Sequence, residues 1–204
     1  MMNKINIYLY KTHNEKLDKS NFFSNYRSNK IKDITNDKVY ETSLISEHLL
    51  YYALKNEDVR VDKLEIETYE YGKPYFKNLD KYFNISHSME YVVVGLSNLD
   101  LAVDIQMIDS KYLKISKKLY YDNNNNRDIN QVIRDFTIKE AFIKYYGKSI
   151  LYNLKDINID DNYVSTNLED SLSYKSYLID NYYLTVVSKD DFILNINKVN
   201  NLST

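Results

Sequence analysis

Residues 83–107 read FNISHSMEYVVVGLSNLDLAVDIQM, and this stretch decides what kind of fold the chain adopts. The run from Tyr91 to Leu96 is almost wholly apolar and rich in β-branched residues, which is typical of a buried strand. A second apolar strand, Leu99–Met107, follows after a short turn at Ser97–Asn98. Two buried strands joined by a tight turn predict a sheet in the middle of the chain.

Helices are expected on either side of this sheet. Residues 37–54 carry apolar positions near helical spacing, and residues 128–146 form the most periodic helix of the chain. Shorter helices are expected near residues 17–26 and 111–120. Further strands are expected at residues 5–10, 64–69, 154–159, 173–178, 182–187 and 192–196. The same order of strand, helix and several strands occurs twice, so we predict an α+β fold with an N-terminal half, residues 1–98, and a C-terminal half, residues 99–204.

The composition limits the class of protein. The chain has 204 residues, of which 44% are hydrophobic, so it can bury a sizeable core. The chain has 27 Lys and Arg residues and 29 Asp and Glu residues, which gives a net charge of −2. A nucleic-acid-binding protein usually has a clear basic excess, so this balance argues against that class. The absence of cysteine excludes disulfides and thiolate zinc sites.

No apolar run approaches the roughly 20 residues that cross a bilayer. The N-terminus reads as a strand, so we expect a cytoplasmic protein that does not bind a membrane.

Asp104 is the first residue that points to chemistry. It lies within the apolar strand Leu101–Ile105. A buried carboxylate is costly unless it is paired, hydrogen-bonded or bound to a metal. Taken alone, Asp104 is equally consistent with a capping residue at a solvated strand end.

Glu140 favours the functional interpretation. In the helix of residues 128–146 an apolar stripe is formed by Ile129, Val132, Ile133, Phe136 and Ile143. Glu140 lies in the middle of this stripe, and Lys144 follows one turn later on its flank. The alternative is an exposed Glu–Lys pair, worth a few tenths of a kcal/mol. That alternative does not explain why the charges lie on the apolar side.

Lys73 and His87 suit an anion. Lys73 lies in the turn Gly72–Pro74, which uses two of the few turn residues of a chain with 3 Gly and 1 Pro. His87 is flanked by Ser86 and Ser88. Together with two inward carboxylates, these residues predict a site for Mg²⁺ and phosphate oxygens. No glycine-rich nucleotide loop occurs, which excludes P-loop and Rossmann enzymes.

Four segments occur here in the order and spacing of Sfp-type 4′-phosphopantetheinyl transferases: Gly72–Pro74, Phe83–Ser88, Ala102–Gln106 and Phe136–Lys148. The chain thus resembles that family over about residues 72–148. The resemblance implies two pseudo-twofold related halves with the active site in the cleft between them. It also implies Mg²⁺ as cofactor and coenzyme A as co-substrate. The implied reaction is that of a holo-[acyl-carrier-protein] synthase: 4′-phosphopantetheine passes to a serine of an acyl or peptidyl carrier protein, and 3′,5′-ADP is released.

The resemblance also implies roles for single residues. Asp104, Glu140 and Gln106 would hold the metal. Glu140 would also take the proton from the carrier serine. Lys144 would contact the coenzyme A pyrophosphate and stabilise the departing 3′,5′-ADP. Further coenzyme A contacts would come from Ser43, Lys73, Ser86 and His87, with His87 on the 3′-phosphate and Lys30 and Lys32 near that group.

Three residues depart from the family pattern. Gln106 stands where an acidic residue is usual, and an amide oxygen in its place should weaken metal affinity. Phe136 replaces a tryptophan, which keeps the packing but removes the indole donor. Thr42 replaces an arginine that contacts phosphate.

Other functions remain open at this point. A different Mg²⁺-dependent transferase or phosphatase would use the same carboxylates. A catalytically weakened homologue would bind coenzyme A or a carrier protein without efficient transfer. A scaffold without a site gives no reason for the position of Glu140. Two halves in one chain make a monomer the simplest oligomeric state, and the carrier protein is not identified by the residues.

Overall fold

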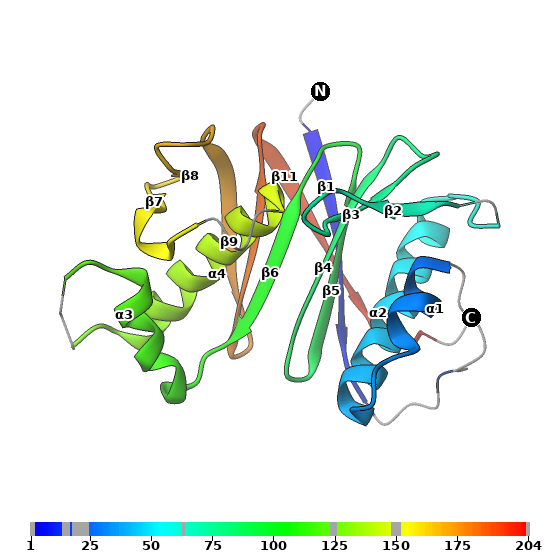
Figure 1. Ribbon diagram of the computed structural model, residues 1–204, viewed down its shortest axis with the longest axis horizontal. Coiled ribbons are helices and arrows are strands. Elements are labelled where there is room, and N and C mark those ends of the chain that lie inside the picture. Colours follow the sequence, from blue (N-terminus) through cyan, green and yellow to red (C-terminus); the bar gives the residue numbers. More distant parts are fainter. Residues whose placement is uncertain are drawn as a thin grey trace.

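The computed structural model describes residues 3–13, 17, 25–62, 64–122, 126–147 and 152–202. Two principal sheets, ordered β11-β1-β5-β4 and β6-β10-β9-β8-β7, lie beside a small β2-β3 hairpin (Figure 1). The strands are β1 (Asn3–Lys11), β2 (Ile66–Thr68), β3 (Pro74–Phe76), β4 (Tyr82–Ser88), β5 (Tyr91–Ser97), β6 (Ala102–Met107), β7 (Asn158–Ile159), β8 (Tyr163–Ser165), β9 (Leu172–Ile179), β10 (Tyr182–Ser188) and β11 (Phe192–Val199). The helices are α1 (Asn25–Ile31), α2 (Asp37–Asn56), α3 (Ser116–Leu119) and α4 (Ile129–Tyr146), with 3₁₀ turns η1 (Ser110–Ile115) and η2 (Leu154–Asp156). The arrangement is a mixed α+β fold, as the sequence predicts.

Three apolar clusters hold the layers together. The first lies between α2 and the β11-β1-β5-β4 sheet and includes Tyr8 and Leu49. The second lies between the two sheets and includes Ile7 and Val103. The third lies between α4 and the β6-β10-β9-β8-β7 sheet and includes Phe142. In Figure 1, α2 and α4 accordingly lie on opposite outer sides with the sheets between them.

The sheets approach each other closely where β5 meets β6. A Cβ atom added to Gly95 would lie 2.4 Å from Leu101 Cδ1 and 2.9 Å from Val103 Cγ1. Such distances are too short for non-bonded carbon atoms, so a side chain at this position would require the side chains of Leu101 and Val103 to move. The close packing of β5 on β6 therefore favours glycine at position 95. Gly72 has φ 86° in the turn before β3, a left-handed conformation that suits glycine.

β4 and β6 are terminal strands of their sheets and lie side by side (Figure 1). β4 pairs with β5, and β6 pairs with β10, so the remaining edges of β4 and β6 face one another. Side chains alternate along a strand. Val103 and Ile105 therefore point into the cluster between the sheets, whereas Asp104 and Gln106 share the face of β6 that α4 covers. Asp104 and Gln106 thus lie at the line where the two sheets meet.

Most expected elements are confirmed with shifted ends, and two are wrong in type. The helix expected at residues 111–120 is the 3₁₀ turn η1 followed by the single-turn helix α3. The first half of the strand expected at residues 154–159 is η2, because the Asn153 side chain accepts a hydrogen bond from the Lys155 backbone and so begins a turn. The helix expected near residues 17–26 falls mostly outside the described residues.

The C-terminal strand crosses the expected boundary between the halves. β11 pairs in parallel with β1, so a strand from the end of the chain forms the edge of the sheet that holds β1, β5 and β4. The other strands of the two principal sheets divide between them at residue 98, and β2 and β3 form the separate hairpin. Within the described ranges, no helix is both long enough and apolar enough to span a membrane.

Candidate active site

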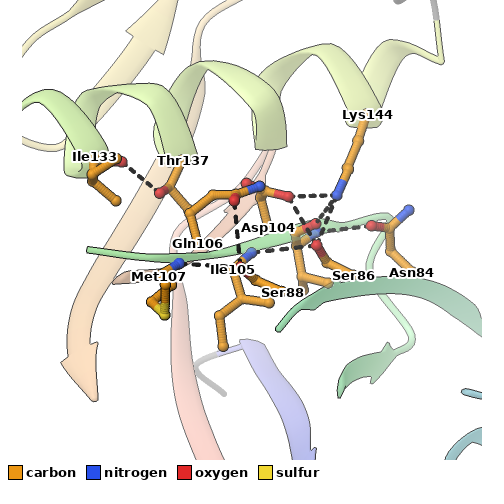
Figure 2. A network of polar contacts seen from close by, with 11 residues as sticks. Asn84, Ser86, Ser88, Asp104, Ile105, Gln106, Met107, Ile133, Thr137 and Lys144 are labelled. Atoms are coloured by element: carbon orange, nitrogen blue, oxygen red, sulfur yellow. Dashed lines mark hydrogen bonds and ion pairs between the residues drawn. The ribbon is translucent and has the colours of Figure 1, made fainter. Parts of the chain in front are cut away.

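The Asp104 carboxylate lies at the centre of a polar network between β4, β6 and α4 (Figure 2). Asp104 is only 1% exposed. Its Oδ1 accepts hydrogen bonds from Ser86 Oγ at 2.8 Å and from Lys144 Nζ at 2.5 Å. Its Oδ2 is buried without a hydrogen-bond partner in the described part of the chain. Because a buried carboxylate oxygen without a donor is costly, this atom is available to a cation.

Lys144 reaches the network from the last turn of α4, and Figure 2 shows its side chain extending from the helix to β6. Its Nζ also donates to Ser86 Oγ at 2.9 Å. The ammonium therefore fixes α4 against both β4 and β6 and places a positive charge beside Asp104. The implied contact of Lys144 with the coenzyme A pyrophosphate stays a prediction.

Glu140 is half-buried and lies one turn before Lys144 on α4. Burial raises the pKa of its carboxyl, the charge of Asp104 raises it further, and Lys144 opposes both effects. The predicted position needs a correction in detail, since the α4 residues that are 0% exposed are Val132, Thr137, Ile138, Ala141 and Phe142. Glu140 lies at the margin of the buried face, where its carboxyl interacts electrostatically with Asp104.

Asp104 and Glu140 fit a divalent cation. An ion would satisfy Asp104 Oδ2 and relieve the repulsion between the two carboxylates. Among the residues that the structure describes, no group of three or more His, Asp or Glu could hold a metal. The ion would therefore need other oxygen ligands, such as the Gln106 amide, water or substrate phosphates, which is the usual coordination of Mg²⁺.

Three polar side chains of β4 satisfy the free backbone edge of β6. Asn84 Oδ1 accepts from Val103 N at 3.0 Å, Ser86 Oγ accepts from Ile105 N at 3.3 Å, and Ser88 Oγ accepts from Met107 N at 3.1 Å. Sequence reasoning placed Ser88 beside His87 at the predicted anion site and assigned no role to Asn84, so neither backbone contact was expected. The signal that would have found them is the period-two alternation of polar residues with Phe83, Ile85 and His87 in this segment.

His87 lies on the other face of β4. It is exposed and lines a cavity of about 300 Å³ together with Asn36, Lys38, Val39, Thr42 and Met89. Ser86 and His87 are neighbours in a strand, so their side chains point to opposite faces and do not share a pocket. Thr42, and not Ser43, is among the residues that line this cavity; Ser43 is half-buried on α2.

Lys73 contacts neither Asp104 nor the cavity lined by His87, and forms its own contacts between the turn before β3 and α4. Its Nζ donates to Asp100 Oδ1 at 2.7 Å and to the Tyr145 carbonyl at 2.9 Å, which joins the turn before β3 to the end of α4. Burial lowers the pKa of Lys73, and Asp100 opposes that effect. Its nucleotide contact stays a prediction. Lys32 Nζ donates to Asn29 Oδ1 at 3.0 Å, and the side chain of Lys30 lies outside the described residues.

Known proteins with similar sequences share one description. The chain is 32% identical over 133 residues to 4′-phosphopantetheinyl transferase gsp of Aneurinibacillus migulanus, a match of 61% of this chain and 56% of that relative. It is 31% identical over 151 residues to 4′-phosphopantetheinyl transferase Sfp of Bacillus subtilis (strain 168), covering 67% and 65%. It is 29% identical over 168 residues to 4′-phosphopantetheinyl transferase ffp of Bacillus subtilis, covering 74% and 71%. The chain thus spans less than two thirds of the first two relatives, and no protein-family model matches it.

Proposed function

We propose that this chain, a relative of the Sfp-type 4′-phosphopantetheinyl transferases, transfers 4′-phosphopantetheine from coenzyme A to a serine of an acyl or peptidyl carrier protein. The observation that carries the proposal is the buried Oδ2 of Asp104, which has no hydrogen-bond partner among the described residues. The Asp104 carboxylate also lies near a second carboxylate, that of Glu140. A Mg²⁺ ion held there by Asp104 and Glu140 would supply charge neutralisation for the pyrophosphate.

The residues of the chain account for the remaining steps. The carrier serine oxygen attacks the β-phosphorus of coenzyme A, and the bond from that phosphorus to the bridging oxygen of the α-phosphate breaks. Glu140 accepts the serine proton, and its raised pKa makes it a better base than an exposed carboxylate. The bond electrons leave with 3′,5′-ADP, whose negative charge Lys144 stabilises from its position beside Asp104.

The nucleotide end of coenzyme A is assigned to the cavity that His87 lines. Lys38 lies in the same cavity, so a phosphate there would meet an ammonium and an imidazole. His87 belongs to β4, whose opposite face carries Ser86 of the Asp104 network. One strand thus connects the proposed nucleotide contact with the proposed metal site.

The carrier protein is assigned to the basic surface of η1 and α3. Residues 110–121 contain four lysines and no acidic residue, and they follow directly after β6 and Asp109. Lys117, Lys118 and Lys155 line a surface hollow with Tyr121, whose side chain is 69% exposed. Charge complementarity therefore favours a carrier with an acidic docking surface.

The same proposal includes two pseudo-twofold related halves (residues 1–98 and 99–204), a monomeric state and a cytoplasmic location. The test is to incubate the protein with coenzyme A, Mg²⁺ and an apo carrier protein and to weigh the carrier by mass spectrometry. A gain of one phosphopantetheine group, absent without Mg²⁺, supports the proposal. Absence of any gain over a panel of acyl and peptidyl carriers contradicts it.

A second candidate is a weakened homologue that binds coenzyme A without efficient transfer. It is favoured by Gln106, which supplies an amide where a carboxylate is expected, and by Thr42, which stands where an arginine is usual. Calorimetry that shows coenzyme A binding, together with no mass gain on the carrier, would identify this case.

A further inference from the structure

Ser86 and Ser88 make the same pair of contacts two residues apart on β4. Ser86 Oγ donates to Asp104 Oδ1 at 2.8 Å and accepts from Ile105 N at 3.3 Å. Ser88 Oγ lies 3.5 Å from Gln106 Oε1 and accepts from Met107 N at 3.1 Å. Each hydroxyl therefore bridges one oxygen-bearing side chain of β6 and the backbone of the next residue (Figure 2).

The hydroxyl of Ser86 is fully used. A serine hydroxyl offers one donor and two acceptor positions. Its hydrogen goes to Asp104, and its acceptor positions take Ile105 N and Lys144 Nζ. Ser86 is also only 4% exposed. A phosphate would have to displace one of these partners from the interior, so Ser86 is poorly suited to contact coenzyme A directly.

We infer that Ser86 is a positioning residue that orients the Asp104 carboxylate for the divalent cation, and that Ser88 acts in the same way, more weakly, on Gln106. Ser86 and Lys144 both hold Oδ1, which leaves Oδ2 as the oxygen without a donor among the described residues. The weaker role of Ser88 follows from its longer contact with a neutral amide. This inference rests on the metal site of the proposed function and gives Ser86 a role other than phosphate binding.

The expected loss of metal affinity on removing the Ser86 hydroxyl can be estimated from other groups that orient metal ligands. Loss of such a group usually weakens metal affinity about 10- to 100-fold. Ser86→Thr keeps the hydroxyl. Ser86→Val introduces a side chain of nearly the same shape as threonine but without the hydroxyl. A difference between these two variants therefore reports the hydroxyl and not the added methyl group.

The test measures Mn²⁺ affinity by the electron paramagnetic resonance signal of free Mn²⁺, with and without coenzyme A. We expect Ser86→Thr to bind Mn²⁺ nearly as well as the natural protein and Ser86→Val to bind it about 10- to 100-fold more weakly. Ser173 provides the matched control, since its buried hydroxyl donates at 2.8 Å to Asp191 outside this network. Ser173→Val should leave Mn²⁺ affinity unchanged even if it lowers the thermal unfolding midpoint.

Each outcome has a distinct meaning. Equal Mn²⁺ affinity of Ser86→Thr and Ser86→Val overturns the positioning role while leaving carrier modification intact. A natural protein that binds no Mn²⁺ under either condition overturns both the positioning role and the proposed metal site. A loss in Ser173→Val as large as in Ser86→Val shows a general packing effect and also overturns the inference.

Discussion

Lys144 Nζ lies 2.5 Å from Asp104 Oδ1, and this ion pair joins the last turn of α4 to the middle of β6. The two side chains differ in exposure, with 31% for Lys144 and 2% for Asp104. Lys144 is therefore the partner that a substrate anion reaches first, while Asp104 remains in the interior. The pair brings an ammonium and a carboxylate into one site, where the proposed function assigns the first to phosphate and the second to a metal.

Asp104→Asn should abolish transfer while the protein still folds. The substitution keeps the shape of the side chain but removes the charge that would anchor the metal. A loss of about a thousandfold in kcat is the scale expected when charge stabilisation in the transition state disappears. Steady-state transfer assays at saturating Mg²⁺ check this, with Asp191→Asn as a control because Asp191 accepts a comparable serine hydrogen bond elsewhere. Retention of most of the activity would show that Asp104 does not hold the metal.

Gln106→Glu should lower the Mg²⁺ concentration needed for half-maximal activity. The change adds a charged oxygen on the same face of β6 as Asp104. Titration of transfer activity with Mg²⁺ measures the effect, and Gln131→Glu on the exposed side of α4 controls for added negative charge. An unchanged requirement would mean that residue 106 does not contribute to the metal site.

Glu140→Gln should raise stability near pH 7 while it removes activity. Burial and Asp104 raise the pKa of Glu140 above its ordinary value of 4.5, so the folded protein holds this proton more tightly than the unfolded chain. The charged carboxylate therefore destabilises the fold above its raised pKa, and this cost vanishes as pH falls below 4.5. Thermal unfolding without metal should show a stabilised variant at neutral pH and a smaller gain in acid. A variant that is less stable at pH 7 would contradict the expectation.

His87→Ala should raise KM for coenzyme A far more than for dephospho-coenzyme A, which lacks the 3′-phosphate. A charge-assisted hydrogen bond to phosphate is worth about 1.5–3 kcal/mol, or roughly ten- to a hundredfold in binding. His13→Ala is the control, since His13 lies against Tyr10 on another strand. Equal losses for the two coenzymes would remove His87 from the 3′-phosphate.

Lys117→Glu combined with Lys118→Glu should raise KM for the carrier protein and leave KM for coenzyme A unchanged. Both lysines are exposed on α3 and line the basic hollow, so reversing their charge should repel an acidic partner. The effect should weaken as salt is added. Lys4→Glu with Lys198→Glu makes the same change in net charge on β1 and β11. If this control behaves like the α3 variant, the effect comes from net charge and not from docking.

The amino-acid sequence was sufficient where a local pattern carried the information. The apolar run before Ser97 and the periodic helix of residues 128–146 predicted the sheet and α4, because a wholly buried strand is an unbroken apolar run and a helix with one buried face repeats apolar residues every three to four positions. Asp104 and Glu140 stood out for the same reason, since a charge within an apolar pattern requires a compensating group. The raised pKa of Glu140 and its dependence on Asp104 agree with that reading.

The tertiary structure decided what depended on which strands became neighbours. Ser86 lies against Asp104 because β4 and β6 meet as terminal strands of two sheets, and β11 returns from the chain end to pair with β1. Lys73 contacts Asp100 and the Tyr145 carbonyl, a contact between segments far apart in the chain. The partners of a polar side chain are set by the order of strands in space, and a local pattern of residues does not contain that order.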